Sequence, residues 1–149
     1  TCNGNGKDRP NMPTWGNLQT NFLKKFNDCG VPPERIDYVT CTHLHFDHVG
    51  WNTRMHNGSW IPTFPNARYL FSKEEYGYWI KKPEKEIVDD LNGIADSVTP
   101  IVQAGLAQFV SDDYRIDENV RLIPTPGHTP HHVSVVIESQ GKKAIITGD

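Results

Sequence analysis

The sequence offers little that would connect it with a membrane or with nucleic acid. None of its apolar runs approaches the length of about 20 residues that a bilayer-spanning helix needs. Its 15 basic and 18 acidic residues leave a formal net charge of −3, and no basic run or stripe stands out. Nucleic-acid binding therefore has no electrostatic support, and we expect neither a nucleic-acid nor a membrane partner.

Cysteine is also scarce. The three cysteines, Cys2, Cys29 and Cys41, are odd in number and widely spaced, which argues against a disulfide framework. No Cys-x-x-Cys pair is present, so a structural zinc site built from thiolates is not expected. This usage suits a reducing compartment, and we expect a cytoplasmic location.

The composition is that of a globular chain with helices and loops in its first two thirds. Hydrophobic residues make up 36% of the 149 residues and charged residues 22%, enough for one domain with a core. Apolar residues at helical spacing predict helices at 18–29 and 84–103, the second broken near Pro100. A capping box at Ser72 to Glu75 predicts the start of another helix. Glycine, asparagine and proline predict loops over residues 1–16 and 50–66.

Strands are predicted at two places in the first half of the chain and throughout its last third. β-Branched and aromatic residues between turn signals predict strands at 36–41, 67–71, 108–110, 119–123, 133–137 and 143–147. Gln140-Gly141 suits the turn of the final hairpin. We therefore expect one α/β (α+β) domain over residues 1–149, with helices packed on sheet.

Three of the seven histidines fall within six residues, directly after the predicted strand 36–41. Imidazole nitrogen binds zinc and other first-row metals, and carboxylate oxygen completes such sites. His43 and His45 are two apart, so they point to one side of an extended segment. Asp47 and His48 follow where the chain turns, so they can face a neighbouring point. Two offset pairs of ligands are what two metals bridged by one hydroxide need.

Two more candidate ligands follow strands later in the chain. His128 lies in a Pro/Gly turn after the strand that ends at Ile123, and Asp149 ends the strand that contains residues 144–147. Taken alone, His128 could equally be a surface residue, and Asp149 would be read as a turn former. The first motif favours both as ligands, because ends of separate strands can converge on one metal centre.

The remaining histidines and the nearby aromatic residues have simpler interpretations. A lone histidine is usually a surface residue or a satisfied core residue, and we interpret His56 in this way. His131 and His132 belong to the same class, although either could hold a ligand in place. Aromatic residues in the predicted loop 50–66 either bind substrate or anchor the loop on the core: Trp51, Trp60 and Phe64.

The three motifs, in this order, resemble those of the metallo-β-lactamase-fold superfamily. Residues 42–50 (THLHFDHVG) look like its first metal-binding signature, residues 126–129 (PGHT) like its second and residues 147–149 (TGD) like its third. The resemblance runs from near residue 1 to residue 149. It implies an αββα sandwich with the metals at the sheet edges, incomplete here at both ends.

The resemblance also implies a dinuclear zinc centre with a bridging hydroxide, whose ligands come from all three motifs: His43, His45, Asp47, His48, His128 and Asp149. The first metal takes the histidines of the first two motifs, and the second takes Asp47 and His48, with Asp149 between the two. Asp47 would also pass a proton to the leaving group. Family members carry another ligand histidine beyond the bridging Asp. We therefore expect an internal fragment of a longer protein, with its second metal site incomplete.

Within the superfamily, Trp51-Asn52-Thr53 and residues 60–67 look most like bacterial lactonases of the quorum-quenching type. The long connection from His48 to His128 suits these enzymes better than glyoxalase II, whose signature has Gly-Gly where this chain has Gly50-Trp51. The resemblance implies a small-molecule substrate, such as an N-acyl homoserine lactone, and a possible homodimer.

Other functions remain open from the sequence. The same metal core could hydrolyse organophosphate triesters or β-lactams, since the metal motif alone does not select the substrate. A non-catalytic metal-binding module, or an oxygen-sensing module with two irons, is the rival from another class. His48, and the absence of a carboxylate at position 45, disfavour a di-iron redox centre.

Overall fold

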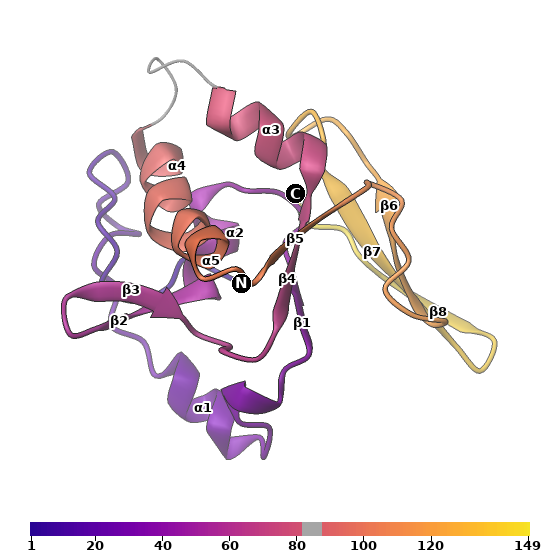
Figure 1. Cartoon of the computed structure of the whole chain (residues 1–149), viewed down its shortest axis with the longest axis horizontal. Helices are drawn as coiled ribbons and strands as arrows, with labels where there is room; N and C mark the ends of the chain where they lie inside the picture. Colours follow the sequence, from indigo (N-terminus) through magenta and orange to yellow (C-terminus); the bar gives the residue numbers. More distant parts are fainter. Residues whose placement is uncertain (82–87) are drawn as a thin grey trace.

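The computed structural model describes residues 1–81 and 88–149, and it has the expected mixture of helices and strands (Figure 1). The helices are α1 (Phe22–Asp28), α2 (Phe46–Val49), α3 (Lys73–Lys81), α4 (Val88–Gly93) and α5 (Thr99–Gln103), with short 3-10 turns η1 (Pro33–Arg35) and η2 (Gly50–Asn52) and a π-helical segment η3 (Ile94–Val98). The strands are β1 (Tyr38–Thr40), β2 (Thr53–His56), β3 (Ser59–Pro62), β4 (Arg68–Ser72), β5 (Ala107–Val110), β6 (Val120–Pro124), β7 (Val133–Ser139) and β8 (Lys142–Ile146). Among the described residues, no helix has both the length and the apolar character to cross a membrane.

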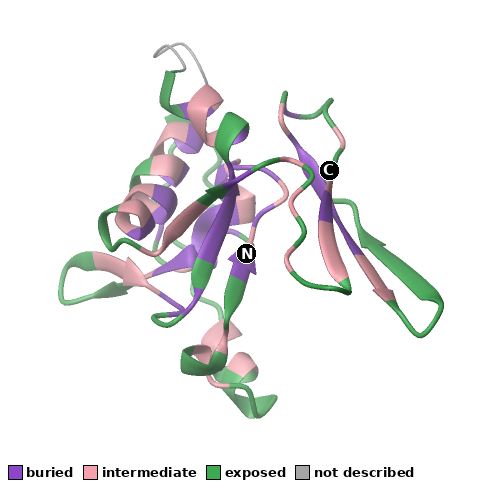
Figure 2. Cartoon of the chain, turned by 45° about the vertical axis from the view of Figure 1, so that its right-hand side comes forward, coloured by how far each residue is buried: buried purple, intermediate pink, exposed green. Residues whose placement is uncertain are grey.

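Two sheets and a group of helices form three layers. Strands β1, β4 and β5 pair in parallel, and β6, β7 and β8 pair antiparallel. Figure 1 shows the helices α2–α5 on one side of the first sheet and the second sheet on its other side. This order matches helix, sheet and sheet of the expected αββα sandwich. The far face of the second sheet is open, and β8 is exposed along its whole length (Figure 2).

The central strand β4 builds both cores. Its side chains alternate between the two faces of the sheet, as they do in any strand. Tyr69 and Phe71 enter the core beneath the helices, with Val39 and Ile101, whereas Leu70 enters the core between the two sheets. Because β4 is buried on both faces, the helices pack on one face of this strand and the second sheet packs on the other.

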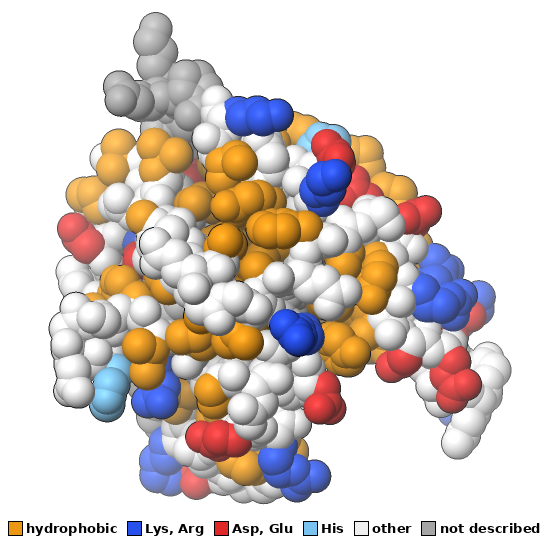
Figure 3. All heavy atoms as spheres, in the orientation of Figure 1, with side chains coloured by type: hydrophobic (Ala, Val, Ile, Leu, Met, Phe, Trp, Pro, Cys, Tyr) orange, Lys and Arg blue, Asp and Glu red, His pale blue; other side chains and the backbone are white. Residues whose placement is uncertain are grey.

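The helical layer leaves part of the first sheet in water. Figure 3 shows hydrophobic side chains gathered over the middle of one face, where α3, α5 and β5 lie in Figure 1. Phe109 in the edge strand β5 remains 40% exposed, although the ring of Tyr76 packs 4.6 Å from it. A partly exposed aromatic side chain at a sheet edge is ordinary in a small folded chain.

The predicted loop over residues 50–66 is wrong, because most of it is structured. The 3-10 turn η2 is followed by the antiparallel hairpin β2–β3. The turn between the strands is Asn57-Gly58, and both residues have positive φ, 48° and 79°. Asn-Gly is the preferred pair for such a two-residue hairpin turn. The Asn57-Gly58 pair therefore indicated a hairpin in the sequence, but Pro62 and Pro65 suggested a loop.

Three other predicted elements differ in extent. Strand β1 begins only at Tyr38, because the 3-10 turn η1 occupies residues 33–35 and β1 is an edge strand paired with β4 alone. Helix α1 begins at Phe22, since Leu18 instead accepts a backbone hydrogen bond from Gly6, 2.9 Å long. Of the helix predicted at 84–103, residues 84–87 lie outside the described residues.

The break predicted near Pro100 is also wrong. Residues 88–103 stay helical, because η3 widens the helix just before the proline and Thr99 donates its N–H to the Ile94 carbonyl. Pro100 lacks the N–H that would bond the Asp96 carbonyl in a continuous helix, and this carbonyl instead accepts a hydrogen bond of 2.6 Å from the Thr53 hydroxyl.

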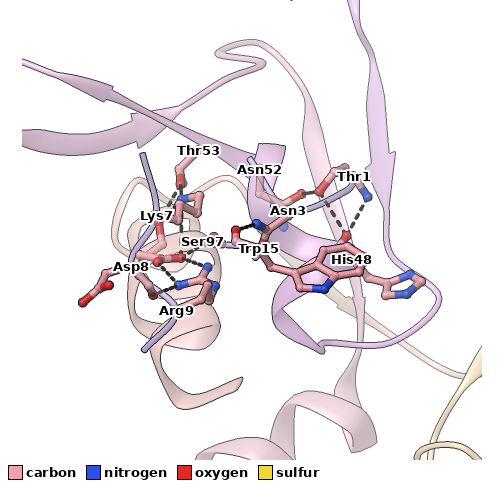
Figure 4. A network of polar contacts seen from close by, with 11 residues as sticks. Thr1, Asn3, Lys7, Asp8, Arg9, Trp15, His48, Asn52, Thr53 and Ser97 are labelled. Atoms are coloured by element: carbon pink, nitrogen blue, oxygen red, sulfur yellow. Dashed lines mark hydrogen bonds and ion pairs between the residues drawn. The ribbon is translucent and has the colours of Figure 1, made fainter. Parts of the chain in front are cut away.

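The segment before α1 is held to the helices by a buried ion cluster (Figure 4). The Arg9 guanidinium lies 2.8 Å from Asp96 in η3, and the Lys7 ammonium lies 3.4 Å from the same carboxylate. Both cationic side chains are fully buried, and Lys7 also donates to the Thr53 hydroxyl at 2.8 Å. Burial lowers the pKa of Lys7 to about 8, although Asp96 opposes the shift. One carboxylate thus serves two buried cations.

We expect Asp96→Asn to lower the free energy of unfolding by about 3–5 kcal/mol, because it leaves buried cations without a counter-charge. Without Asp96, Lys7 gives up its proton more readily, so the deficit should narrow as the pH rises toward 8. Urea denaturation at several pH values measures both effects. Asp28→Asn is the matched control: it removes the exposed Lys24–Asp28 pair, 2.6 Å long, and should cost less than about 1 kcal/mol. Equal losses in the two variants would contradict this account.

The same N-terminal segment lies directly against the turn that follows α2. A Cβ atom on Gly50 would lie 1.8 Å from the backbone oxygen of Asn3. The Thr1 hydroxyl donates to Asn52 in the same turn at 2.9 Å (Figure 4). Position 50 therefore has to be glycine for this backbone approach.

We expect Gly50→Ala to destabilise the folded chain by about 1–3 kcal/mol, because the added methyl forces two backbone segments apart. Gly77→Ala supplies the control, since a Cβ there meets no atom of residues 1–81 and 88–149 within 4 Å. Gly77 lies in α3, so that change should stabilise by about 0.5–1 kcal/mol through helix propensity. Thermal denaturation distinguishes the two; a Gly50→Ala variant as stable as the parent would refute the close approach.

Candidate metal centre

The first motif has the geometry that its spacing predicts. The chain leaves β1 in an extended conformation. His45, at the N-cap of α2, still has extended dihedral angles (φ −64°, ψ 151°). The chain then turns: the N–H of His48 donates to the carbonyl of His45 at 3.0 Å. His43 and His45 therefore precede the turn, while Asp47 and His48 lie on the short helix α2.

His128 from the second motif joins the first two histidines. Its Nε2 lies 2.8 Å from Nδ1 of His45, and its ring centroid lies 4.7 Å from that of His43. One ligand atom from each of His43, His45 and His128 lies within 4.8 Å of the other two. Three imidazole nitrogens at such spacing are close enough to bind one metal ion.

Asp149 completes a second group with His43 and His48. Its Oδ1 lies 3.0 Å from Nε2 of His48, and its Oδ2 lies 3.8 Å from Nε2 of His128. Ligand atoms of His43, His48 and Asp149 again lie within 4.8 Å of one another. The Asp149 carboxylate thus faces both histidine groups, as the expected bridging position requires.

A glycine allows Asp149 to approach. Gly148 has a φ of 67°, and a Cβ there would lie 2.6 Å from the Thr42 hydroxyl and 2.7 Å from Nε2 of His132. A side chain would therefore push Asp149 away from the histidines. This contact also explains why a Gly-Asp pair follows the last strand.

Asp47 lies at the edge of the cluster. Its Oδ2 is 3.6 Å from Nε2 of His48, but its oxygens belong to neither of the two groups of close ligand atoms. Asp47 instead lines the open cavity beside the histidines. This position suits a carboxylate that meets a substrate, and its part as a ligand remains a prediction.

Burial and the neighbouring histidines keep His43 and His45 neutral. Burial, followed by the neighbouring histidines, lowers the pKa of His43 to about 2; burial, with His128 next, lowers that of His45 to about 4. Near pH 7 each ring therefore has a nitrogen lone pair to offer. Metal ligation requires this form, because a protonated imidazole has no free lone pair.

One buried nitrogen identifies the centre of the site. Nδ1 of His43 has the Thr42 hydroxyl 3.0 Å away, whereas its buried Nε2 has no hydrogen-bond partner among the residues that the structure describes. A buried polar atom without a partner costs about 1–3 kcal/mol. His43 belongs to both groups of ligand atoms, and a metal ion bound there would give its Nε2 a partner. The donor set of imidazoles and carboxylate fits zinc.

The cavity beside the cluster has a volume of about 270 Å³. Its lining combines apolar side chains, Met12, Trp15 and Phe46, with polar ones: His45, Asp47, Asp90, His128 and Asp149. Trp15 packs edge-on against Phe46 at 6.4 Å between ring centroids.

The aromatic residues predicted as substrate contacts lie elsewhere. Trp51 is buried and stacks on Phe22 of α1 at 4.7 Å, and buried Phe64 packs against Phe26 at 5.5 Å. Trp60 lies beneath the Lys7 ammonium, 3.6 Å from its ring centroid. These positions correspond to the anchoring alternative, because hydrophobic contact with α1 and the N-terminal segment covers them. None of the three lines the 270 Å³ cavity.

Met12 and Trp15 were missed because they occur in a segment whose composition predicted only a loop. No sequence pattern places them beside the histidines; in the structure Trp15 remains 46% exposed. His56 is exposed at the end of β2, as expected. His132 is buried, with Nδ1 2.8 Å from the Thr125 hydroxyl, and His131 forms a 3.4 Å ion pair with Asp112.

The three motifs thus meet in the geometry of a known fold family. A model of the metallo-beta-lactamase superfamily matches residues 17–149, and the chain belongs to this superfamily. It is 32% identical over 123 residues to an N-acyl homoserine lactonase of Bacillus sp, which covers 80% of this chain and 39% of the lactonase.

Solved structures agree on the fold. A probable metal-dependent hydrolase from Staphylococcus aureus superposes with a TM-score of 0.81 at 22% identity, over 100% of this chain and 52% of that one. An N-acyl homoserine lactone hydrolase with N-hexanoyl-L-homoserine at its catalytic metal centre gives 0.56 at 27% identity, over 85% and 42%. The chain spans about half or less of the length of these relatives.

Proposed function

We propose that this chain carries the metal-binding centre of a zinc-dependent hydrolase that opens lactone rings, such as those of N-acyl homoserine lactones. The observation that carries this proposal is buried His43, which belongs to both groups of ligand atoms and whose Nε2 has no hydrogen-bond partner in the described part of the chain. The similarity to an N-acyl homoserine lactonase of Bacillus sp supports the substrate class.

Histidines 43, 45 and 128 would hold one metal ion. Asp47, His48 and Asp149 would help to hold a second. Bound zinc ions lower the pKa of a coordinated water and polarise a carbonyl oxygen. The same site could accept other carbonyl or phosphoryl substrates, so the choice of a lactone depends on the cavity.

The cavity suits a substrate with a polar ring and an apolar tail. A lactone ring would lie near Asp47 and Asp149, and an acyl chain would lie against Met12 and Trp15, which line the same cavity. Hydrolysis joins the oxygen of water to the carbonyl carbon and breaks the bond to the ring oxygen. The Asp47 carboxylate would take the proton from the attacking water and deliver it to the departing ring oxygen.

A double change, His43→Ala with His45→Ala in the full-length protein, tests the metal centre. Bound zinc should fall, and lactone hydrolysis should fall by more than the 10–100-fold typical of losing a residue that only supports a ligand. Metal analysis and hydrolysis of N-hexanoyl homoserine lactone measure the two effects. His56→Ala is the control, because His56 lies exposed at the end of β2. Unchanged zinc content and rate in the double variant would reject the assignment.

A substrate panel separates the lactonase from its rivals. The zinc-loaded full-length protein should hydrolyse acyl homoserine lactones faster than a phosphotriester or a β-lactam. A preference for either of these would leave the metal centre in place and move the substrate assignment. Zinc binding without hydrolysis of any of them would favour a non-catalytic metal-binding module.

Asp47→Asn tests the proton transfer. We expect kcat to fall by about 10²–10⁴, because an amide carries no proton between water and the leaving oxygen. The loss should be smaller for the matching thiolactone, since a departing thiolate needs less protonation. If both substrates lose the same factor and zinc is lost with it, Asp47 acts as a ligand instead of a proton carrier.

A further inference from the structure

A buried carboxylate stands beside the metal centre and belongs to none of the three motifs. Glu75 lies in the first turn of α3 and is only 1% exposed. Its backbone N–H donates to the Ser72 hydroxyl at 3.1 Å, which confirms half of the predicted capping box. In a complete capping box the carboxylate would turn back to the N-cap amide. The Glu75 carboxylate instead turns toward the histidine motifs.

The two oxygens of Glu75 reach both histidine segments. Oε1 accepts a hydrogen bond of 3.3 Å from the N–H of Leu44, the residue between His43 and His45. Oε2 accepts one of 3.3 Å from the N–H of His131, just after the second motif. One carboxylate therefore joins the segment that carries His43 and His45 to the segment that carries His128.

The same carboxylate orients a ring that packs on a ligand. The indole N–H of Trp79 donates to Oε1 of Glu75 at 2.8 Å. The Trp79 ring then meets the His45 ring edge to face, with centroids 5.2 Å apart and an interplanar angle of 78°. Glu75 thus influences His45 twice, through the backbone before it and through the indole beside it.

A second chain of contacts leads from the same helix end to the second motif. The Ser72 hydroxyl donates to Asp112 at 2.5 Å, and the other oxygen of Asp112 lies 3.4 Å from Nδ1 of His131. The start of α3 is therefore connected to His131, just after the second motif, through both its backbone N–H and its side chain. Because a buried charge is costly unless hydrogen bonds satisfy it, a carboxylate at this position needs all its donors.

We propose that Glu75 is a positioning residue of the metal centre, which fixes the spacing between the His43–His45 segment and His128 and sets the orientation of His45. This inference rests on the metal centre proposed above. Residues that hold metal ligands in place typically contribute 10–100-fold to metal affinity, without touching the metal.

The test is zinc affinity in the full-length protein, measured by competition with a chelator under conditions where the variant is folded. In Glu75→Gln, an amide NH₂ replaces one accepting oxygen and faces an N–H donor. We expect zinc to bind about 10–100-fold more weakly. Glu74→Gln, the exposed neighbour on the same turn, is the matched control and should bind zinc as the parent does.

A purely structural role would produce a different result. It would lower the urea midpoint of the metal-free protein while leaving the zinc affinity of the folded protein within about twofold, and that outcome would overturn the proposal. Glu75→Asp keeps the charge but withdraws the carboxylate by one carbon, so it should also weaken zinc binding if Glu75→Gln does not fold. Parental zinc affinity in Glu75→Asp would likewise overturn it.

The two proposals fail in distinguishable ways. If His43→Ala with His45→Ala leaves zinc bound, the metal centre itself is wrong. If that double change removes zinc but both Glu75 variants bind it normally, only the positioning role is wrong.

Discussion

The metal centre depends on the contact between two sheets at the ends of β1 and β7. The N–H of Val133 donates to the carbonyl of Thr42 at 2.9 Å, which joins the strand before the first motif to the strand after the second. Neither strand pairs with the other along its length. This contact lies between two parts of the chain that are distant in sequence, and it brings His43 and His128 within 4.7 Å between ring centroids.

Close backbone approaches around this contact leave little freedom for the ligands. Gly50 lets the N-terminal segment lie against the turn after α2, and Gly148 lets Asp149 reach His48 and His128. Burial then keeps His43 and His45 neutral. The desolvation cost of the imidazoles is therefore met when the chain folds, and neutral imidazoles have the lone pairs that metal ligation requires.

Local sequence patterns were enough to predict the first histidine motif. The other parts of the site depend on contacts between residues distant in sequence, which local patterns do not show. His43 to His48 were recognisable because their spacing directly determines their directions on an extended segment and a turn. His128 and Asp149 required the assumption that strand ends converge, which the structure bears out. The cavity wall from Met12 and Trp15 could not be predicted, because their loop reaches the site only through contacts distant in sequence. Glu75 was not predicted as a residue of the site, because the capping box at Ser72 to Glu75 already explained it as part of a helix start.

The central claim is that ends of three separate strands form one metal centre around Nε2 of His43. Anomalous X-ray scattering at the zinc absorption edge, from crystals of the full-length protein loaded with zinc, tests it most directly. The account predicts a zinc peak in contact with His43, His45 and His128, with Asp149 facing it. Zinc bound only at other residues, with Nε2 of His43 left without a metal, would contradict the account.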